Sequence, residues 1–256
     1  MCLMILAHQV SPEYPLLVAA NRDEFNARPT AVSDFWDDQP NLLAGRDLEQ
    51  GGTWMGVTRR GRFAAVTNYR DPARTAVAPC SRGELPLGFL TGCADPASYL
   101  GVLEARATDY AGFNLLVGDG NSLWYFSNSD NEKPLCLPPG IYGLSNARLD
   151  TPWPKVTAGK AKLRTLLAGA AITHDALSNL VNDKQLADPS TLRSHGLDGS
   201  MDPMLSAQFI VSKTYGTRST TTLWLDADAR VSWREQSFNA QGELRDVQQK
   251  DFRVVG

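Results

Sequence analysis

The sequence predicts an α+β fold built mostly from antiparallel sheets. Strand-like runs gather towards the two ends of the chain, with most helical patterns between them, so the elements do not alternate as in a parallel βαβ fold. Neither a P-loop nor a G-x-G-x-x-G fingerprint is present, which removes the usual signs of a nucleotide-binding α/β fold. Strand pairs separated by short turns further favour hairpins and hence antiparallel pairing.

The predicted strands begin with a hairpin. Leu3–Ala7 and Pro15–Ala20 are short apolar runs, and the loop between them contains Ser11 and Pro12. Two more hairpins and a C-terminal meander follow, with these predicted strands: Thr53–Thr58 and Arg62–Thr67; Gly112–Val117 and Leu123–Ser127; Gln208–Ser212, Thr220–Leu225 and Val231–Gln236; and a last strand, Phe252–Val255. Asp226–Arg230 is a predicted turn within the meander.

Four segments carry helical patterns. Gly83–Thr91 is a short candidate, and Pro96–Ala105 follows Asp95, a residue type that caps helix N-termini. Trp153–Ala171 has apolar residues at helical spacing after a Thr-Pro start signal, and His174–Asn182 is a shorter candidate.

Composition indicates an ordinary globular protein. The chain has 256 residues with no repeat or clear linker, and we expect a single domain over residues 1–256. A net charge of −3 argues against nucleic acid as the main partner. The four cysteines form neither a C-x-x-C pair nor a zinc spacing, no signal peptide is visible, and no apolar run is long enough to span a membrane. A cytoplasmic location with free thiols is therefore expected.

Cys2 is the first candidate for chemistry. It directly follows Met1, so removal of Met1 would leave an N-terminal cysteine, whose thiol is a nucleophile and whose α-amine is a base. The reference pKa of an α-amine is about 7.7–8.0, close to neutral pH. A cysteine at this position is also often incidental, since cysteine is among the residue types most often buried. We expect Met1 to be removed.

Other polar groups lie at the ends of predicted strands. They are Asn21-Arg22-Asp23-Glu24, Asn68, Asn146 and Arg218. Each alone has a structural explanation, such as a solvated turn; together they supply groups suited to amide-bond chemistry. His8, His174 and His195 are weaker base candidates, because only His8 is close to Cys2 in sequence.

Several longer motifs make the chain resemble the NRDE family, which includes the transport and Golgi organisation protein 2 group. These motifs span almost the whole chain in order: Cys2 and its strand, Asn21-Arg22-Asp23-Glu24-Phe25, Arg28-Pro29, Gly45-Arg46-Asp47, Gly51-Gly52-Thr53-Trp54-Met55-Gly56, Thr67-Asn68-Tyr69, Arg82-Gly83-Glu84-Leu85, Gly112-Phe113-Asn114-Leu115, Tyr142-Gly143-Leu144-Ser145-Asn146-Ala147, Thr151-Pro152-Trp153-Pro154-Lys155 and Tyr215-Gly216-Thr217-Arg218.

The resemblance implies a more specific fold and site. The NRDE family is similar to N-terminal nucleophile hydrolases of the choloylglycine hydrolase and penicillin V acylase branch, which implies a four-layer αββα sandwich of two antiparallel sheets. The implied catalytic residues are Cys2, Arg22, Asp23, Asn68, Asn146 and Arg218. Arg22 and Arg218 would depress the pKa of the thiol, Asp23 would hold the α-amine, and the two asparagines would line an oxyanion hole.

One departure from the hydrolase pattern bears on these roles. Arg22 and Asp23 are adjacent here, and adjacent strand residues point to opposite faces. Both would face Cys2 only at a bulge or turn. Alternatively, one of them serves the fold by binding the Gly45-Arg46-Asp47 segment.

The implied function is an N-terminal-cysteine hydrolase or acyltransferase acting on a small amide or thioester through a Cys2 acyl-enzyme. Hydrolysis would need no cofactor and no metal. The resemblance also implies an alternative, a haem or acyl-coenzyme A binding or trafficking protein that uses the same cleft without catalysis, with haem as a cargo ligand. A purely structural role is a third interpretation. The residues themselves offer little for haem ligation, since there is no C-x-x-C-H motif and histidines are few.

Overall fold

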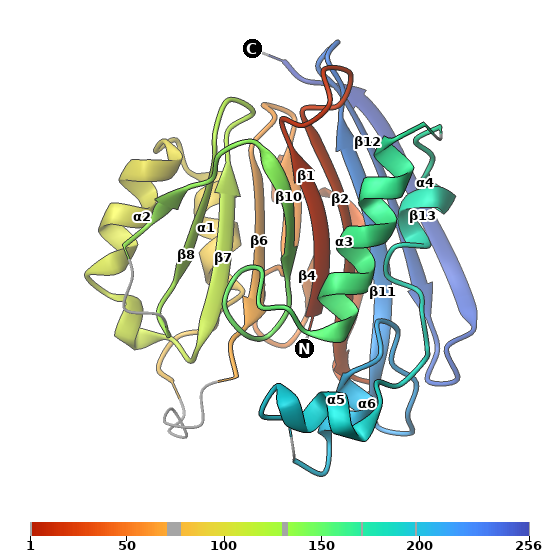
Figure 1. Ribbon diagram of the computed structural model, residues 1–256. Coiled ribbons are helices and arrows are strands. Elements are labelled where there is room, and N and C mark those ends of the chain that lie inside the picture. Colours follow the sequence, from red (N-terminus) through yellow and green to blue (C-terminus); the bar gives the residue numbers. More distant parts are fainter. Residues whose placement is uncertain (1, 71–77, 130–132, 170, 198, 256) are drawn as a thin grey trace.

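The computed structural model describes residues 2–70, 78–129, 133–169, 171–197 and 199–255. Met1, on which the expected N-terminal processing depends, lies outside this part of the chain. The elements form two stacked antiparallel sheets with helices on the two outer faces (Figure 1). The predicted α+β class and the αββα sandwich are both confirmed.

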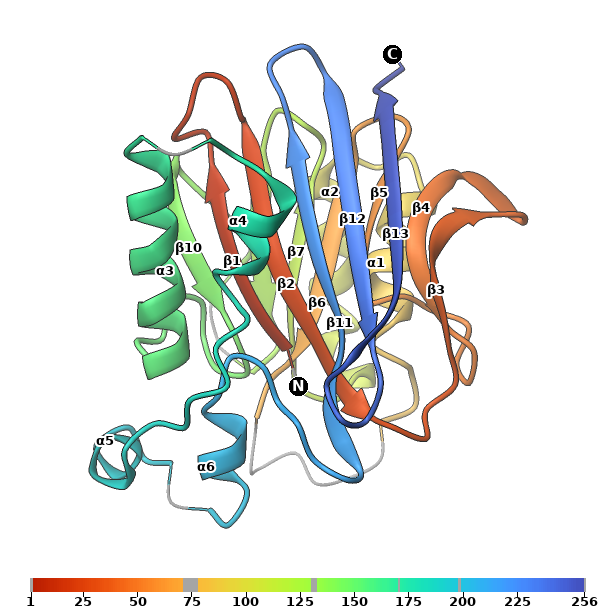
Figure 2. The same ribbon diagram turned by 90° about the vertical axis from the view of Figure 1, so that its right-hand side faces the viewer.

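The first sheet contains β1, which starts at Cys2. Within the described residues it has six strands, seen together in Figure 2, in the spatial order β10 (Gly140–Leu144), β1 (Cys2–His8), β2 (Leu16–Phe25), β11 (Tyr215–Leu225), β12 (Arg230–Phe238) and β13 (Leu244–Arg253). Every neighbouring pair is antiparallel. Strands from both ends of the chain therefore build one sheet around β1 and β2.

The second sheet comes from a continuous run of the chain. Seven strands are described, in the order β3 (Thr30–Trp36), β4 (Gln39–Asp47), β5 (Met55–Thr58), β6 (Phe63–Asn68), β7 (Phe113–Gly118), β8 (Leu123–Ser127) and β9 (Leu135–Cys136). Spatial order equals chain order, so each strand pairs with its sequence neighbour.

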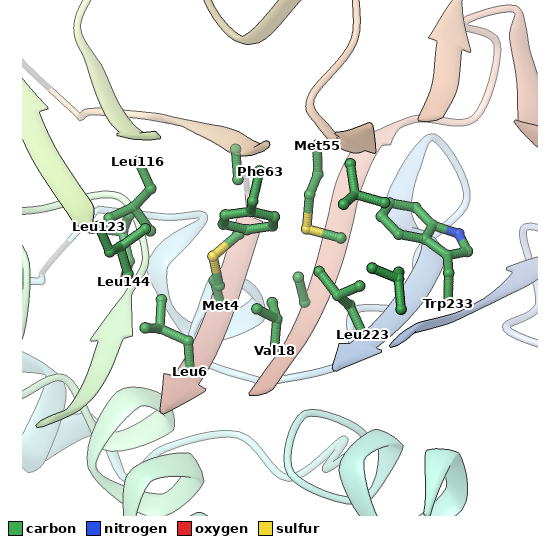
Figure 3. Close-up of a cluster of buried hydrophobic side chains, with 14 of the residues drawn as sticks. Met4, Leu6, Val18, Met55, Phe63, Leu116, Leu123, Leu144, Leu223 and Trp233 are labelled. Carbon is green, nitrogen blue, oxygen red and sulfur yellow. The ribbon is translucent and has the colours of Figure 1, made fainter. Parts of the chain in front are cut away.

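Three apolar clusters separate the four layers. Met4, Val18 and Trp233 of the first sheet meet Met55 and Phe63 of the second between the sheets (Figure 3). A second cluster joins the second sheet to the helices α1 (Glu84–Thr91) and α2 (Pro96–Glu104). A third joins the first sheet to α3 (Pro154–Leu167) and α4 (His174–Ser178).

The pattern in β1 follows from this layering. Met4 and Leu6 belong to the cluster between the sheets, whereas Leu3 and Ile5 belong to the cluster under α3. Both faces of β1 are thus covered, which explains its continuous apolar run. The alternation also assigns Cys2 to the face that points between the sheets.

Two helix predictions are confirmed in detail at their starts. Asp95 caps α2, and its side chain accepts a hydrogen bond from the Ser98 backbone N–H at 2.9 Å. Helix α3 begins at Pro154, but it ends at Leu167 rather than Ala171. Helix α4 likewise ends at Ser178, four residues before the predicted end at Asn182.

Some elements differ from the predictions. Gln208–Ser212 is not a strand: Phe209 and Ile210 are buried, but their backbone hydrogen bonds join loops and the start of β11 instead of a ladder. Elements that the sequence analysis did not predict are β3, β4, β9, β10, the 3₁₀ turn η1 (Ala107–Asp109), α5 (Pro189–Ser194) and α6 (Asp202–Leu205). The last strand, β13, starts eight residues before the predicted Phe252.

Candidate active site

Cys2 begins β1 and lies directly opposite Arg22 of β2 in the antiparallel ladder. The side chains of Cys2 and Arg22 therefore share the face between the sheets. Arg22 is 5% exposed, and its guanidinium carbon lies 4.2 Å from the centre of the Trp54 ring. Nη1 of Arg22 donates to Thr30 Oγ1 at 3.0 Å, and Nη2 lies 3.9 Å from an Asp47 carboxylate oxygen.

The sequence left open whether Arg22 acts beside Cys2 or binds the Gly45-Arg46-Asp47 segment, and in the structure it does both. It lies beside Cys2, and it also contacts Asp47 of the Gly45-Arg46-Asp47 segment. A guanidinium stacked on an indole and held at two further points has few alternative positions. Its positive charge is therefore held in place next to the thiol.

Asp23 lies on the opposite face of β2, as strand alternation requires. Its Oδ1 accepts a hydrogen bond from Thr217 Oγ1 at 2.7 Å, and its main-chain carbonyl accepts one from the Tyr215 hydroxyl at 2.8 Å. Burial raises the pKa of the Asp23 carboxyl, whereas the Lys155 ammonium and the Thr217 hydrogen bond lower it. Asp23 nevertheless borders the same cavity as Cys2.

The register changes beside these two residues. Thr217 of β11 pairs with Asp23 and Ser219 pairs with Arg22, which leaves Arg218 as an extra residue in a β-bulge. The bulge lies in β11, while β2 continues regularly to Phe25, so Arg22 and Asp23 point to opposite faces and do not both face Cys2.

The opposite wall of the cavity comes from the second sheet and the turn before α1. Asn68 is the last residue of β6, and Trp54 precedes β5. Arg82, in the turn before α1, also borders the cavity, and its Nη1 donates to the Gly112 carbonyl at 3.2 Å. The cavity measures about 350 Å³.

Asn146 does not border this cavity. It is 1% exposed, and its Nδ2 donates to the Asn68 main-chain carbonyl at 2.8 Å. Its neighbour Ser145 donates from Oγ to the Cys2 main-chain carbonyl at 3.0 Å. The Ser145-Asn146 pair therefore holds the backbones of Cys2 and Asn68 in place, from the end of β10.

Arg218 is also outside the Cys2 cavity. Its Nη1 donates to the main-chain carbonyls of Phe25, Asn26 and Arg28 at 2.9, 3.1 and 3.4 Å. The side chain faces a second cavity that shares Arg22 and Trp54 with the first. The structure therefore brings together Cys2, Arg22, Asp23 and Asn68, and places Asn146 and Arg218 behind them.

Arg22 lowers the pKa of the Cys2 thiol, as expected, but the net pKa is raised above its usual value. Burial raises the pKa of Cys2, and the negative charge of Asp23 acts the same way. A hydrogen bond from the Asp23 backbone and the charge of Arg22 oppose this rise without reversing it. Burial outweighs the arginine because a thiolate loses its hydration in this site.

Three polar residues near Cys2 were not predicted from the sequence: Ser145, Lys155 and Arg82. Lys155 is 4% exposed, and its Nζ donates to the Leu205 carbonyl at 2.8 Å. Burial lowers the pKa of Lys155, and the charges of Asp23 and Cys2 raise it. All three residues belong to motifs that carry the family resemblance, and this membership was the only sign of a role in the site. The sequence of a motif does not show in which direction each of its polar side chains points.

The four cysteines are free thiols. In the described part of the chain, no group of three or more His, Cys, Asp or Glu side chains is arranged to hold a metal ion. No helix in that part is long and apolar enough to cross a membrane.

The two stacked antiparallel sheets with outer helices, and Cys2 at the start of the first strand beside a cavity, have the fold of the N-terminal nucleophile hydrolases. The fold is similar to that of a conjugated bile acid hydrolase variant from Clostridium perfringens, with a TM-score of 0.53 and 9% sequence identity over 99% of this chain and 98% of the other. The chain belongs to the Transport and Golgi organisation 2 family, whose model matches residues 1–240.

Relatives in that family are similar over nearly their full length. The chain is 39% identical to the Transport and Golgi organization protein 2 homolog of Bos taurus, with 99% of each chain covered. It is 38% identical to the homolog of Homo sapiens, with 93% of each chain covered. The predicted family membership is confirmed.

Proposed function

We propose that the protein is an N-terminal-cysteine hydrolase or acyltransferase that acts on a small amide or thioester through an acyl-enzyme on Cys2. One observation carries the proposal: Cys2, Arg22, Asp23 and Asn68, from strands of both sheets, border a single cavity of about 350 Å³. A nucleophile next to charged groups and an amide donor is the arrangement that acyl transfer needs.

The raised thiol pKa makes a base necessary. In the proposed reaction Met1 has been removed, and the Cys2 α-amine accepts the proton from Sγ as Sγ forms a bond to the substrate carbonyl carbon. The carbonyl electron pair moves to oxygen, and the resulting oxyanion accepts a hydrogen bond from the Asn68 side chain.

Collapse of this intermediate breaks the bond to nitrogen or sulfur. The leaving group takes the proton from the α-ammonium group, and the acyl group stays on Sγ as a thioester. Water, or an acceptor nucleophile in a transferase, then attacks the thioester and restores the thiol. Asp23 holds the α-ammonium group, and Arg22 stabilises negative charge on sulfur.

Ser145, Asn146 and Arg218 support these groups without entering the reaction. Ser145 and Asn146 fix the main chains of Cys2 and Asn68 through the hydrogen bonds described above. Arg218 fixes the turn that follows β2. Such support matters, because a displacement of about 1 Å can lower turnover about 100-fold.

The test is turnover of a panel of small amides and thioesters by wild-type protein, Cys2→Ser and Cys2→Ala. We expect a steep loss in Cys2→Ser and no turnover in Cys2→Ala, because the hydroxyl is a much weaker nucleophile and the methyl group is none. Asn68→Ala should lower turnover about 100- to 1000-fold, the usual effect of losing one oxyanion donor. Cys136→Ala is the matched control, since Cys136 is an exposed free cysteine away from the cavity. Equal turnover in Cys2→Ala and wild type would refute the proposal.

A binding role is a second candidate, favoured by Arg82. Acidic residues border the cleft beside its arginines, and Arg22 and Arg28 both contact Asp47. Within the described residues Arg82 makes no ion pair, which suits it to an anionic ligand such as haem or an acyl-coenzyme A. In that case Cys2→Ala should keep binding within a few fold, whereas Arg82→Gln should weaken it about 10-fold or more, as expected for a lost charge-assisted hydrogen bond. Titration of both variants with haem and with an acyl-coenzyme A separates binding from catalysis.

A further inference from the structure

A second cavity, of about 300 Å³, lies between β3, β11, β12 and β13. We call it the β13 cavity; the residues that matter for its chemistry are Arg218, Ser219, Glu235, Arg245 and Asp246, with Arg22 and Trp54 shared with the Cys2 cavity. The proposed reaction at Cys2 uses none of these groups except Arg22. A cavity of this size accepts a small organic molecule.

Two arginines face this cavity without an acidic partner. Nη1 of Arg218 donates hydrogen bonds to three main-chain carbonyls, and these bonds fix the orientation of the guanidinium. Within the described residues, neither Arg218 nor Arg245 makes an ion pair. Burial lowers the pKa of Arg218, the charge of Glu24 raises it, and the charge of Arg245 lowers it, as expected for a second cation nearby.

The carboxylates of the two acidic residues that border the cavity accept hydrogen bonds from groups other than its arginines. Glu235 is 1% exposed; its Oε1 accepts from the Ser33 backbone N–H at 2.8 Å and its Oε2 from Thr221 Oγ1 at 3.3 Å. Asp246 accepts from the Val247 backbone N–H and from Gln248 Nε2, each at 2.9 Å. Burial also raises the pKa of the Glu235 carboxyl. Since Arg22, Arg218 and Arg245 border the cavity with only two acidic residues, it presents an excess of positive charge.

Ser219 supplies an independent indication of a ligand. Its side chain is 5% exposed and borders the cavity, and its Oγ has no hydrogen-bond partner in the described part of the chain. Buried hydroxyl groups are rarely left without a partner, because the lost hydration is not replaced. A ligand atom in the cavity would supply the missing partner.

We propose that the β13 cavity binds a small anionic molecule with a carboxylate or phosphate group. Arg218 and Arg245 hold the anion through charge-assisted hydrogen bonds, and the Ser219 hydroxyl donates a further one. Trp54 and Phe238 provide apolar surface for an attached carbon group. The proposal is independent of the reaction assigned to Cys2, because it rests on a different cavity and on residues outside the proposed reaction.

The test is calorimetric titration of the full chain with phenyl phosphate and with benzoate, which separates the two anion classes. Arg245→Gln and Ser219→Ala are the main variants, because Arg245 is exposed and the Ser219 hydroxyl has no partner to lose. Arg218→Gln is secondary, since it also removes the hydrogen bonds that hold the turn after β2. Arg230→Gln, at the far end of β12, is the charge-matched control.

We expect at least one of the two probes to bind to wild type and to the Arg230→Gln control. Arg245→Gln should weaken that binding about 10-fold or more. Ser219→Ala should weaken binding and, in the same protein without ligand, raise the melting temperature, because it removes an unsatisfied buried hydroxyl. A merely structural serine would not give this opposite pair of effects.

Arg82→Gln separates the two cavities, since Arg82 borders only the Cys2 cavity. Binding that falls in Arg82→Gln but not in Arg245→Gln would place the anion beside Cys2 and overturn the proposal. So would failure of both probes to bind wild type, or equal binding by wild type, Arg245→Gln and Ser219→Ala.

Discussion

The Cys2 thiol lies beside a fixed arginine and yet has a raised pKa. The Arg22 guanidinium, stacked 4.2 Å from the centre of the Trp54 ring, stabilises the thiolate and lowers the pKa. Burial destabilises the thiolate by a larger free energy, so the net pKa is raised. The thiol is therefore protonated near neutral pH, and its attack on a carbonyl requires a base. An α-amine on the same residue would meet that need.

This balance predicts the pH dependence of thiol reactivity. The raised pKa means that, at a given pH, a smaller fraction of Cys2 is thiolate than of a free cysteine, whose pKa is about 8.5. Alkylation of Cys2 by iodoacetamide should therefore reach half its maximal rate at a higher pH than alkylation of free cysteine. Arg22→Gln should move this midpoint further upward, because a positive charge that favours the thiolate is lost. Mass spectrometry of the N-terminal peptide measures the rate. A midpoint below that of free cysteine would contradict the account.

The sequence indicated the residue types of the site better than their positions. Cys2, Arg22, Asp23 and Asn68 border one cavity. Asn146 and Arg218 lie behind it, and the reasons are local: Asn146 bonds to the Asn68 backbone, and Arg218 is the extra residue of a bulge. Neither the partner of a buried amide nor the place of a bulge can be read from residue type.

At the scale of elements, the polar run after Ala20 is part of a central strand. The structural explanation of a solvated turn is wrong for Asn21, Arg22 and Asp23, which are all buried within β2. Asn21 shows how such a strand is tolerated: Nδ2 donates to the carbonyls of Val181 and Gln208, and Oδ1 accepts from Thr220 Oγ1. Burial of polar groups is stable when each one has a partner.

The glycine pair before β5 has a specific packing role at Gly52. A Cβ atom there would lie 2.5 Å from the Gly83 carbonyl carbon, within the turn that carries Arg82. The close approach lets the Thr53 backbone N–H donate to the Gly83 carbonyl at 3.1 Å. Gly52 thereby holds the Arg82 turn against the second sheet.

Gly52→Ala should therefore destabilise the protein by about 1–3 kcal/mol, since the clash is with backbone that cannot move aside freely. It should also lower any activity that depends on Arg82. Gly101→Ala is the matched control: no heavy atom would lie within 4 Å of its Cβ, and in helix α2 it should stabilise by about 0.5–1 kcal/mol. Urea unfolding measures both changes. An unchanged free energy of unfolding in Gly52→Ala would show that the turn can shift without cost.

The unpredicted elements have physical reasons of their own. Strand β13 is an edge strand with exposed polar side chains over much of its length, so it lacks the alternating apolar pattern that marks a half-buried strand. Gln208–Ser212 has the opposite character: it contains apolar residues because it is a buried loop. Apolar content alone does not separate a buried loop from a strand.

At the scale of the whole molecule, buried polar groups join the two sheets near Cys2. Thr67 Oγ1 of β6 donates to the Ser145 carbonyl at 2.7 Å, and Asn114 Nδ2 of β7 donates to the Ala147 carbonyl at 3.0 Å. Ser145 in turn donates to the Cys2 carbonyl. The sheet-to-sheet geometry and the position of the nucleophile are therefore coupled.

The order of strands and helices was enough to predict the α+β class, and the resemblance predicted the stacked sheets. The order of strands within each sheet was not predictable in the same way. The first sheet places β11 beside β2, although nearly two hundred residues separate them, and this pairing depends on contacts that local patterns do not contain.

The proposed function requires that Cys2 becomes the N-terminal residue and carries the acyl group. Mass spectrometry of the N-terminal peptide, before and after brief reaction with an activated thioester, tests it most directly. We expect a chain that starts at Cys2 and gains one hydroxylamine-sensitive acyl group on that residue, with no such group in Cys2→Ala. Met1 fully retained in protein that turns over substrate, or acylation that leaves Cys2 unmodified, would contradict it.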